Sequence, residues 1–173
     1  SRAHVTLQFP ARGDMAPVAW HWYEGKKDGK KLTPPEELLA KVLKKGEKLA
    51  DSGSILVGDK GILFSPNDYG AQFRIIGEGF DGLNLTKPEK LPINGKGDQG
   101  MKDEWVRAMR EGKSEVAMSN FDYAGMLTET VLLGNVAIRT GKKLEWDGPN
   151  MRAKNAPESA QFVQREYRKG WTL

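Results

Sequence analysis

The segment SNFDYAGMLTETVLLGNVAIRTG, from Ser119 to Gly141, constrains the fold more than any other part of this sequence. It is long enough for a helix of about five turns, Ser119 can cap its start, and Gly141 can close its end. Residues that share one face at helical spacing are Leu127, Val131, Gly134 and Ile138. We therefore expect a helix from about Phe121 to Arg139 that buries this face against a sheet.

The first half of the chain alternates in the manner of β-strands. HVTLQF and VAWHWYEG flank the loop PARGDMAP and predict a hairpin, and SILVGDKGILFS predicts a second hairpin, followed by a strand at AQFRIIG. Thr33, Pro34 and Glu36 form a helix-start signature. Further along, KDEWVRAMREG predicts a helix, KLEWD a short strand, and PESAQFVQREYRKG a terminal helix that Pro157 opens. This order predicts a single α+β domain over residues 1–173.

Composition argues against several classes of protein. The chain has 173 residues, 38% hydrophobic and 29% charged, and no apolar run reaches the roughly 18 residues that cross a bilayer. The net charge is +4, but acidic residues interleave with basic ones, so neither a membrane nor a nucleic acid is an expected partner. Cysteine is absent, and the two histidines, His4 and His21, lie in separate strand-like segments without an i, i+4 partner. No metal site is therefore predicted.

The segment INGKGDQGMKDEW has the glycine spacing of a dinucleotide-binding fingerprint at Gly95, Gly97 and Gly100. That fingerprint needs a buried strand before the glycines and an acidic residue at the end of a second strand after them. Here KPEKLPIN brings two prolines before the glycines, and VAMSNFDYAG leads into the long helix instead of a strand. We therefore expect a loop before a helix, with no cofactor bound by this chain.

The second half of the chain resembles a known family. Residues 119–173 contain SNFDYAGMLTETVLLGNVA, GKKLEWD and REYRKGW, which are similar in order and in letters to the C-terminal end of Gfo/Idh/MocA-type oxidoreductases. The likeness is to the NADH-dependent dehydrogenases of this family in planctomycetes and Bacteroidetes. It continues more weakly through WYEG and GDKG, so that it covers essentially the whole chain.

The resemblance implies an open, largely antiparallel β-sheet with helices packed on one face. It also implies that the chain is the C-terminal part of a longer enzyme, whose N-terminal Rossmann domain binds NAD or NADP. The family's Lys-Pro motif and its following histidine and aspartate motif are not in this sequence, so no residue here is predicted to be catalytic. Where relatives carry histidines before an EWIRA-like helix, this chain has Gly100-Met101-Lys102-Asp103.

The resemblance further implies assembly into a homo-oligomer. Family members commonly form dimers or tetramers through the open face of the sheet. The first predicted hairpin has His21 and Tyr23 on its second face, and such groups suit a wet interface. We therefore expect His21 and neighbouring strand residues at a two-fold contact.

Four residues are candidates for substrate binding: Tyr23, Asn120, Asp122 and Tyr123. SNFDY places the last three at a helix start, where backbone N–H groups and loop side chains often meet ligands. The alternative is that this segment caps the helix and packs against it. Tyr23 lies near a loop, on the strand face opposite the two tryptophans, and its ring can stack on a sugar.

The expected function is that of a substrate-binding and assembly domain in a nicotinamide-dependent oxidoreductase acting on a sugar, a polyol or a related hydroxyl compound. One alternative is the same domain of an NAD-dependent glycoside hydrolase. Another is a stand-alone carbohydrate-binding or scaffold module, which the aromatic residues support. Relatives include both cytoplasmic and periplasmic proteins, so no localisation is predicted.

Overall fold

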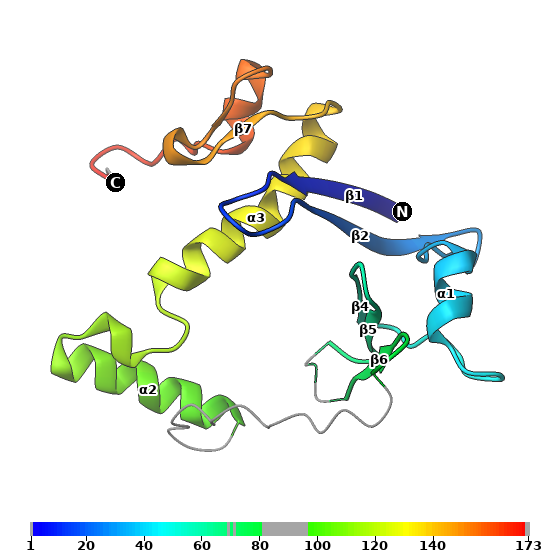
Figure 1. Cartoon of the computed structure of the whole chain (residues 1–173). Helices are drawn as coiled ribbons and strands as arrows, with labels where there is room; N and C mark the ends of the chain where they lie inside the picture. Colours follow the sequence, from blue (N-terminus) through cyan, green and yellow to red (C-terminus); the bar gives the residue numbers. More distant parts are fainter. Residues whose placement is uncertain (1, 69, 71, 81–96, 172–173) are drawn as a thin grey trace. The chain divides into compact units, whose positions relative to one another are not determined.

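The computed structural model describes residues 2–68, 70, 72–80 and 97–171, and it confirms the α+β class (Figure 1). The helices are α1 (Glu36–Val42), α2 (Gly97–Glu111) and α3 (Phe121–Thr140), with short 3-10 helices η1 (Ser114–Val116), η2 (Gly148–Asn150) and η3 (Pro157–Phe162). The strands are β1 (Arg2–Phe9), β2 (Val18–Lys27), β3 (Lys30–Lys31), β4 (Ser54–Val57), β5 (Ile62–Ser65), β6 (Arg74–Ile76), β7 (Trp146–Asp147) and β8 (Arg152–Ala153).

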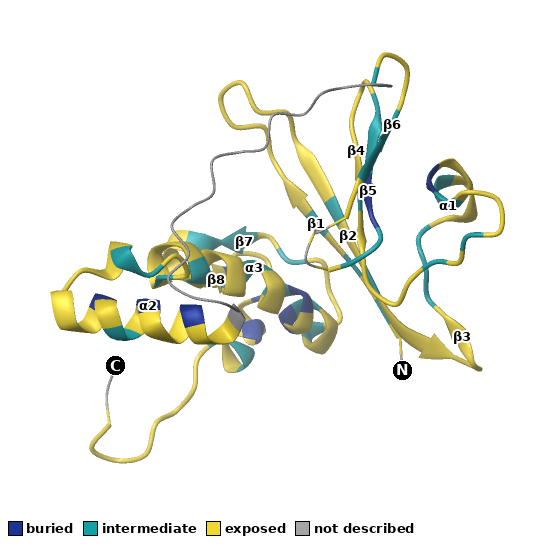
Figure 2. Ribbon diagram, turned by 90° about the horizontal axis from the view of Figure 1, so that it is seen from below, coloured by how far each residue is buried: buried dark blue, intermediate teal, exposed yellow. Residues whose placement is uncertain are grey.

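Few side chains of the described residues are fully buried, as the small amount of dark blue in Figure 2 indicates. The buried hydrophobic residues are Val42, Phe64, Ala108, Val136, Ala153 and Ala156. Four of these six are alanine or valine from the second half of the chain, so little apolar surface is removed from water there.

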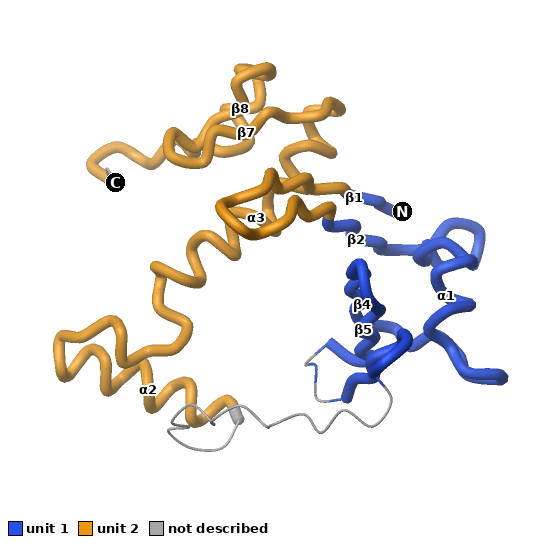
Figure 3. Tube along the Cα trace, viewed as in Figure 1, with its two compact units in different colours: residues 1–5, 20–89 blue, residues 6–19, 90–173 orange. Residues whose placement is uncertain are grey.

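The chain divides into two compact units, which Figure 3 colours separately. The first unit comprises residues 1–5 and 20–89, and the second comprises residues 6–19 and 90–173. Both predicted hairpins are confirmed, but the described strands form three small sheets, ordered β1-β2-β3, β4-β5-β6 and β7-β8, instead of one open sheet. Within each sheet, every strand pairs only with strands that are its neighbours in sequence.

Two fully buried side chains of the first unit, one on β5 and one on α1, are linked through Arg74. Phe64 on β5 and Val42 at the end of α1 are each 2% exposed. Arg74, opposite Phe64 in the register of β5 and β6, lies with its guanidinium carbon 4.7 Å from the Phe64 ring centroid. The same guanidinium donates hydrogen bonds to the Val42 carbonyl and, at 2.6 Å, to Glu47. One arginine thus joins a helix end, a loop carboxylate and an aromatic ring.

In the second unit, α2 begins earlier than the sequence predicts. Gly97 and Gly100 lie inside its first turns, whereas a loop was expected at these glycines; Gly95 lies outside the described residues. The buried face of α2 comprises Gly100, Glu104 and Ala108, which recur every four residues. Trp105, on another side of the helix, is exposed. A glycine costs about 1 kcal/mol in a helix interior, and its small size suits a buried helical face.

The long helix is confirmed as α3, but its predicted buried face is wrong. Leu127, Val131 and Ile138 are 50%, 47% and 55% exposed, while Gly134 is buried as expected, together with Val136. α3 contacts η3 in the second unit, and Arg139 stacks on the Phe162 ring at 4.2 Å. Apolar residues occur on every side of this helix, so periodicity alone does not determine which side is buried. The contacts of its C-terminal half bury a different side from the predicted one.

The C-terminal segment does not form the predicted terminal helix. Only η3, a 3-10 helix of six residues, is present between Pro157 and Gly170. Ser159, within η3, is 1% exposed and its hydroxyl donates to the Ala156 carbonyl at 2.7 Å. This bond closes a tight turn within the segment, and the stacking of Arg139 on Phe162 joins the segment to α3. No helix in the described part of the chain is long and apolar enough to cross a membrane.

Candidate functional site

An apolar groove of about 420 Å³ lies in the second unit, between α2 and the start of α3. Its apolar walls come from Met101, Trp105 and Met109 on α2 and from Phe121 on α3, which is 91% exposed. The polar groups that line it are Lys113, Ser114, Ser119, Asn120 and Asp122. The groove therefore combines exposed aromatic and thioether surface with a few polar groups, which is the usual composition of a small-molecule site.

The segment between α2 and α3 is fixed by a buried carboxylate. Glu104, 7% exposed on α2, accepts a hydrogen bond from the Met118 N–H at 3.0 Å. This contact ties residues 117–120 to the buried face of α2, and three of them, Ala117, Ser119 and Asn120, line the groove. The Ala117 carbonyl in turn accepts from the Asn120 backbone N–H at 3.1 Å, which closes a turn before α3.

Asn120 caps α3, as one of the two interpretations of SNFDY predicts. Its Oδ1 accepts from the Asp122 N–H at 3.1 Å, and its Nδ2 donates to the Ala117 carbonyl at 3.0 Å. Asp122 lies in the first turn, where a carboxylate is stabilised by the helix dipole, and its side chain lines the groove. The same interpretation expects Tyr123 to pack, but Tyr123 is 62% exposed.

The structure thus brings three of the four predicted binding residues together at the start of α3. Asp122 and Tyr123 are exposed there, and Asn120 uses its amide to hold the turn. Tyr23 belongs to the first unit and lies on β2. The groove residues on α2 were not predicted, although Met101, Trp105 and Met109, four residues apart, give a periodic signal that points to one face.

Tyr23 is part of an aromatic cluster on the first hairpin. Its ring is stacked on His4 with centroids 4.4 Å apart, and it lies 6.3 Å from His21. Trp20 and Trp22 meet edge to face at 6.0 Å, and the Trp22 indole N–H donates to Glu24 at 2.9 Å. One face of the Tyr23 ring is therefore already occupied. The contact between the two histidines was missed, although the alternation of both strands places them on one face of the hairpin.

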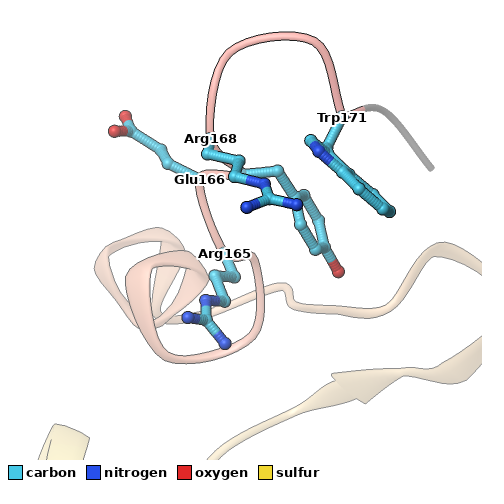
Figure 4. Close-up of a pocket in the computed structure, with 5 residues that line it drawn as sticks. Arg165, Glu166, Arg168 and Trp171 are labelled. Atoms are coloured by element: carbon cyan, nitrogen blue, oxygen red, sulfur yellow. The ribbon is translucent and has the colours of Figure 1, made fainter.

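A smaller hollow of about 280 Å³ lies in the C-terminal segment (Figure 4). It is lined by Arg165, Glu166, Tyr167, Arg168 and Trp171, and the Arg168 guanidinium stacks on the Trp171 ring at 4.6 Å. All five residues come from one continuous stretch of chain. The hollow is therefore a bend of that stretch, and no second element supports it.

Charged pairs elsewhere in the second unit hold its short elements in place. The pKa of Glu158 is lowered, chiefly because Lys142 donates a hydrogen bond to it at 2.6 Å. The pKa of Asp147 is lowered by hydrogen bonds from Asn150 and, more weakly, from Arg152. The described residues contain no group of three histidine, cysteine or acidic side chains arranged to hold a metal ion.

Comparisons of the chain with protein-family profiles, with curated proteins and with solved structures found no match. The family named from the sequence therefore stays a prediction, and so do the cofactor and substrate that it implies.

Proposed function

We propose that this chain is the substrate-binding and assembly domain of a nicotinamide-dependent oxidoreductase that acts on a sugar, a polyol or a related hydroxyl compound. The ordered likeness of residues 119–173 to the C-terminal end of Gfo/Idh/MocA-type oxidoreductases suggests it. The observation that carries it is the groove at the start of α3, which contains predicted residues together with an exposed indole.

The groove suits a polyhydroxylated ligand on chemical grounds. Sugar rings present C–H patches that stack on aromatic faces, and Trp105 offers such a face. Their hydroxyl groups donate to carboxylates, and Asp122 offers one at the rim. Lys113 and Ser119 supply further hydrogen-bonding groups in the lining. In this proposal Asp122 orients the ligand and Trp105 contributes most of the buried area.

The residues of this chain do not fit the pyrophosphate of a nicotinamide cofactor. In the fingerprint the glycines form a turn between a strand and a helix. Here Gly97 and Gly100 lie within α2, and Gly100 is on its buried face. The cofactor is therefore assigned to a separate Rossmann domain, the proposed partner, and no catalytic step is assigned to this chain.

A binding experiment tests the groove. We expect millimolar glucose, myo-inositol or a linear polyol to shift amide resonances of residues 101–122 in NMR titrations of this chain. Asp122→Asn and Trp105→Ala should each weaken that binding at least five-fold. Asp14→Asn, which changes an exposed carboxylate in the loop between β1 and β2, is the matched control and should leave it unchanged. Shifts spread evenly over the chain, or equal affinities in all variants, would contradict the proposal.

The gene itself separates the three functions. A reading frame that encodes a dinucleotide-binding region directly upstream of this segment supports an enzyme and eliminates a stand-alone carbohydrate-binding or scaffold module. The whole gene product, assayed with free sugars and with aryl glycosides, then distinguishes the oxidoreductase from the glycoside hydrolase. Turnover of aryl glycosides with release of the aryl alcohol would replace the first proposal by the second.

A further inference from the structure

The two histidines of this chain meet on the first hairpin. His4 Nε2 on β1 and His21 Nδ1 on β2 are 3.2 Å apart, and the ring centroids are separated by 5.4 Å. These are the only histidines in the sequence, and it contains no cysteine. Both imidazole groups of the chain therefore lie side by side on the first hairpin.

We propose that His4 and His21 together bind a divalent transition-metal ion of the zinc type. The ligand atoms are His4 Nε2 and His21 Nδ1. Imidazole is a preferred ligand of zinc and of neighbouring metals such as cobalt, nickel and copper. The chain supplies two ligands, and water or an oxygen donor from a bound molecule completes the coordination.

The separation of the two nitrogens fits this role. A zinc ion with two imidazole ligands at about 2.0 to 2.1 Å and a tetrahedral angle between them places the nitrogens about 3.3 Å apart. The observed 3.2 Å therefore needs almost no movement of the strands. Binding of one ion requires the two rings to turn until both lone pairs point at it. Without metal, the same approach lets one neutral ring donate a hydrogen bond to the other.

The pair is held in place by its surroundings. The Tyr23 ring lies against His4 with an interplanar angle of 13° and a centroid distance of 4.4 Å, so the imidazole of His4 is stacked on a flat support. Both histidines are exposed, so an ion reaches them from solvent. A site whose ligands are already ordered loses less conformational entropy when it binds.

A simple hydrogen-bonded pair is the competing explanation, and one substitution separates the two. Glutamine in His4→Gln keeps a hydrogen-bonding group near His21 but removes an imidazole ligand. His4→Ala and His21→Ala remove both interactions. Gln8→Ala, on the same strand face as His4 and also exposed, is the matched control.

The experiment is a calorimetric titration of the whole chain with Zn²⁺, repeated with Co²⁺ and followed by visible absorption. We expect the wild-type chain and Gln8→Ala to bind Zn²⁺ with equal affinity, and all three histidine variants to bind at least ten-fold more weakly. Circular dichroism checks that the variants keep their strands. Wild-type affinity in His4→Gln, or no Zn²⁺ binding by the wild-type chain at millimolar concentration, would overturn the proposal. Neither outcome depends on the groove.

Discussion

Replacement of Glu104 by alanine tests the account of how the groove is built. Glu104 is 7% exposed and accepts from the Met118 N–H at 3.0 Å, so it joins α2 to the wall formed by residues 117–120. Glu104→Ala removes that acceptor and leaves the amide without this partner. Glu104→Gln keeps an oxygen of similar reach while removing the charge. Glu104 does not itself line the groove, so both variants leave every lining residue unchanged.

The expected magnitude follows from two contributions. A hydrogen bond to a charged acceptor contributes about 1.5 to 3 kcal/mol. The Cγ methylene group, which alanine lacks, contributes at most about 0.8 kcal/mol if it is fully buried. The higher helix propensity of alanine and the relief of a desolvated carboxylate offset part of this loss. We expect Glu104→Ala to lower the free energy of unfolding of the second unit by about 2 to 3 kcal/mol, and Glu104→Gln by about 1 kcal/mol.

Urea unfolding followed by far-ultraviolet circular dichroism measures the free energies. Amide hydrogen exchange measured by NMR reports directly on the Met118 N–H, whose protection should fall in Glu104→Ala. Glu111→Ala is the control on the same helix. Its carboxylate is exposed and lies 3.7 Å from Arg107 at i, i+4 spacing, so its loss should cost only about 0.3 to 0.5 kcal/mol.

Three results would refute the reasoning. The first is a Glu104→Ala variant within about 0.5 kcal/mol of wild type, since surface substitutions produce changes of that size. The second is a Glu104→Gln variant that loses as much free energy of unfolding as Glu104→Ala, which would mean that the charge and not the acceptor is essential. The third is unchanged exchange at Met118, which would show that this contact does not hold the wall.

Other changes test the remaining contacts. Phe64→Ala should lower the free energy of unfolding by about 3 to 5 kcal/mol, because Phe64 is 2% exposed. Leu132→Ala, at a half-exposed position, should lower it by less than about 1 kcal/mol. Urea unfolding measures both changes. The pKa of Glu47 is lowered from 4.5, chiefly by its hydrogen bond from an arginine, so its stabilisation is present above pH 4.5 and is lost as pH falls through the lowered pKa. Glu47→Gln should therefore lose less stability than wild type in acid, as measured by thermal melts. Asn120→Ala should cost about 1 kcal/mol in the same melts, since it removes the cap of α3. His21→Glu should weaken the predicted self-association in light scattering, and a monomeric wild-type chain would refute that contact.

Local sequence patterns predicted the elements better than the packing. The bounds of α3 follow from its cap at Asn120 and from Gly141, whose φ of 69° closes the helix in the left-handed region. Which side of α3 is covered depends on residues 144–163, which are distant in sequence from its first turns. A helix with apolar residues on every side carries no periodic signal to settle that choice, and so Leu127 was assigned to the wrong face.

The candidate site was predicted in part for the same reason. The start of α3 was found because SNFDY has cap chemistry, which is local. The helix that carries Trp105 and Met109 was predicted, but its apolar face was not assigned to a site, because its approach to the start of α3 depends on the turn between the two helices. The approach of His4 to His21 required the pairing of β1 with β2, which relates residues 17 positions apart. Such contacts depend on strand register, and single-strand patterns do not fix it.

The uneven burial of α3 makes its two ends respond differently to thermal fluctuation. Buried residues of this helix, Gly134 and Val136, lie in its C-terminal half, and Phe121 at the other end is almost fully in water. Local opening should therefore start at the first turns, with Asn120 as the main restraint on unwinding there. A protease that needs an extended substrate would cut between Phe121 and Leu127 before it cuts near Val136. Any molecule that covers the first turns would suppress that cleavage, so the rate of nicking becomes a simple reporter of occupancy at this end of the helix.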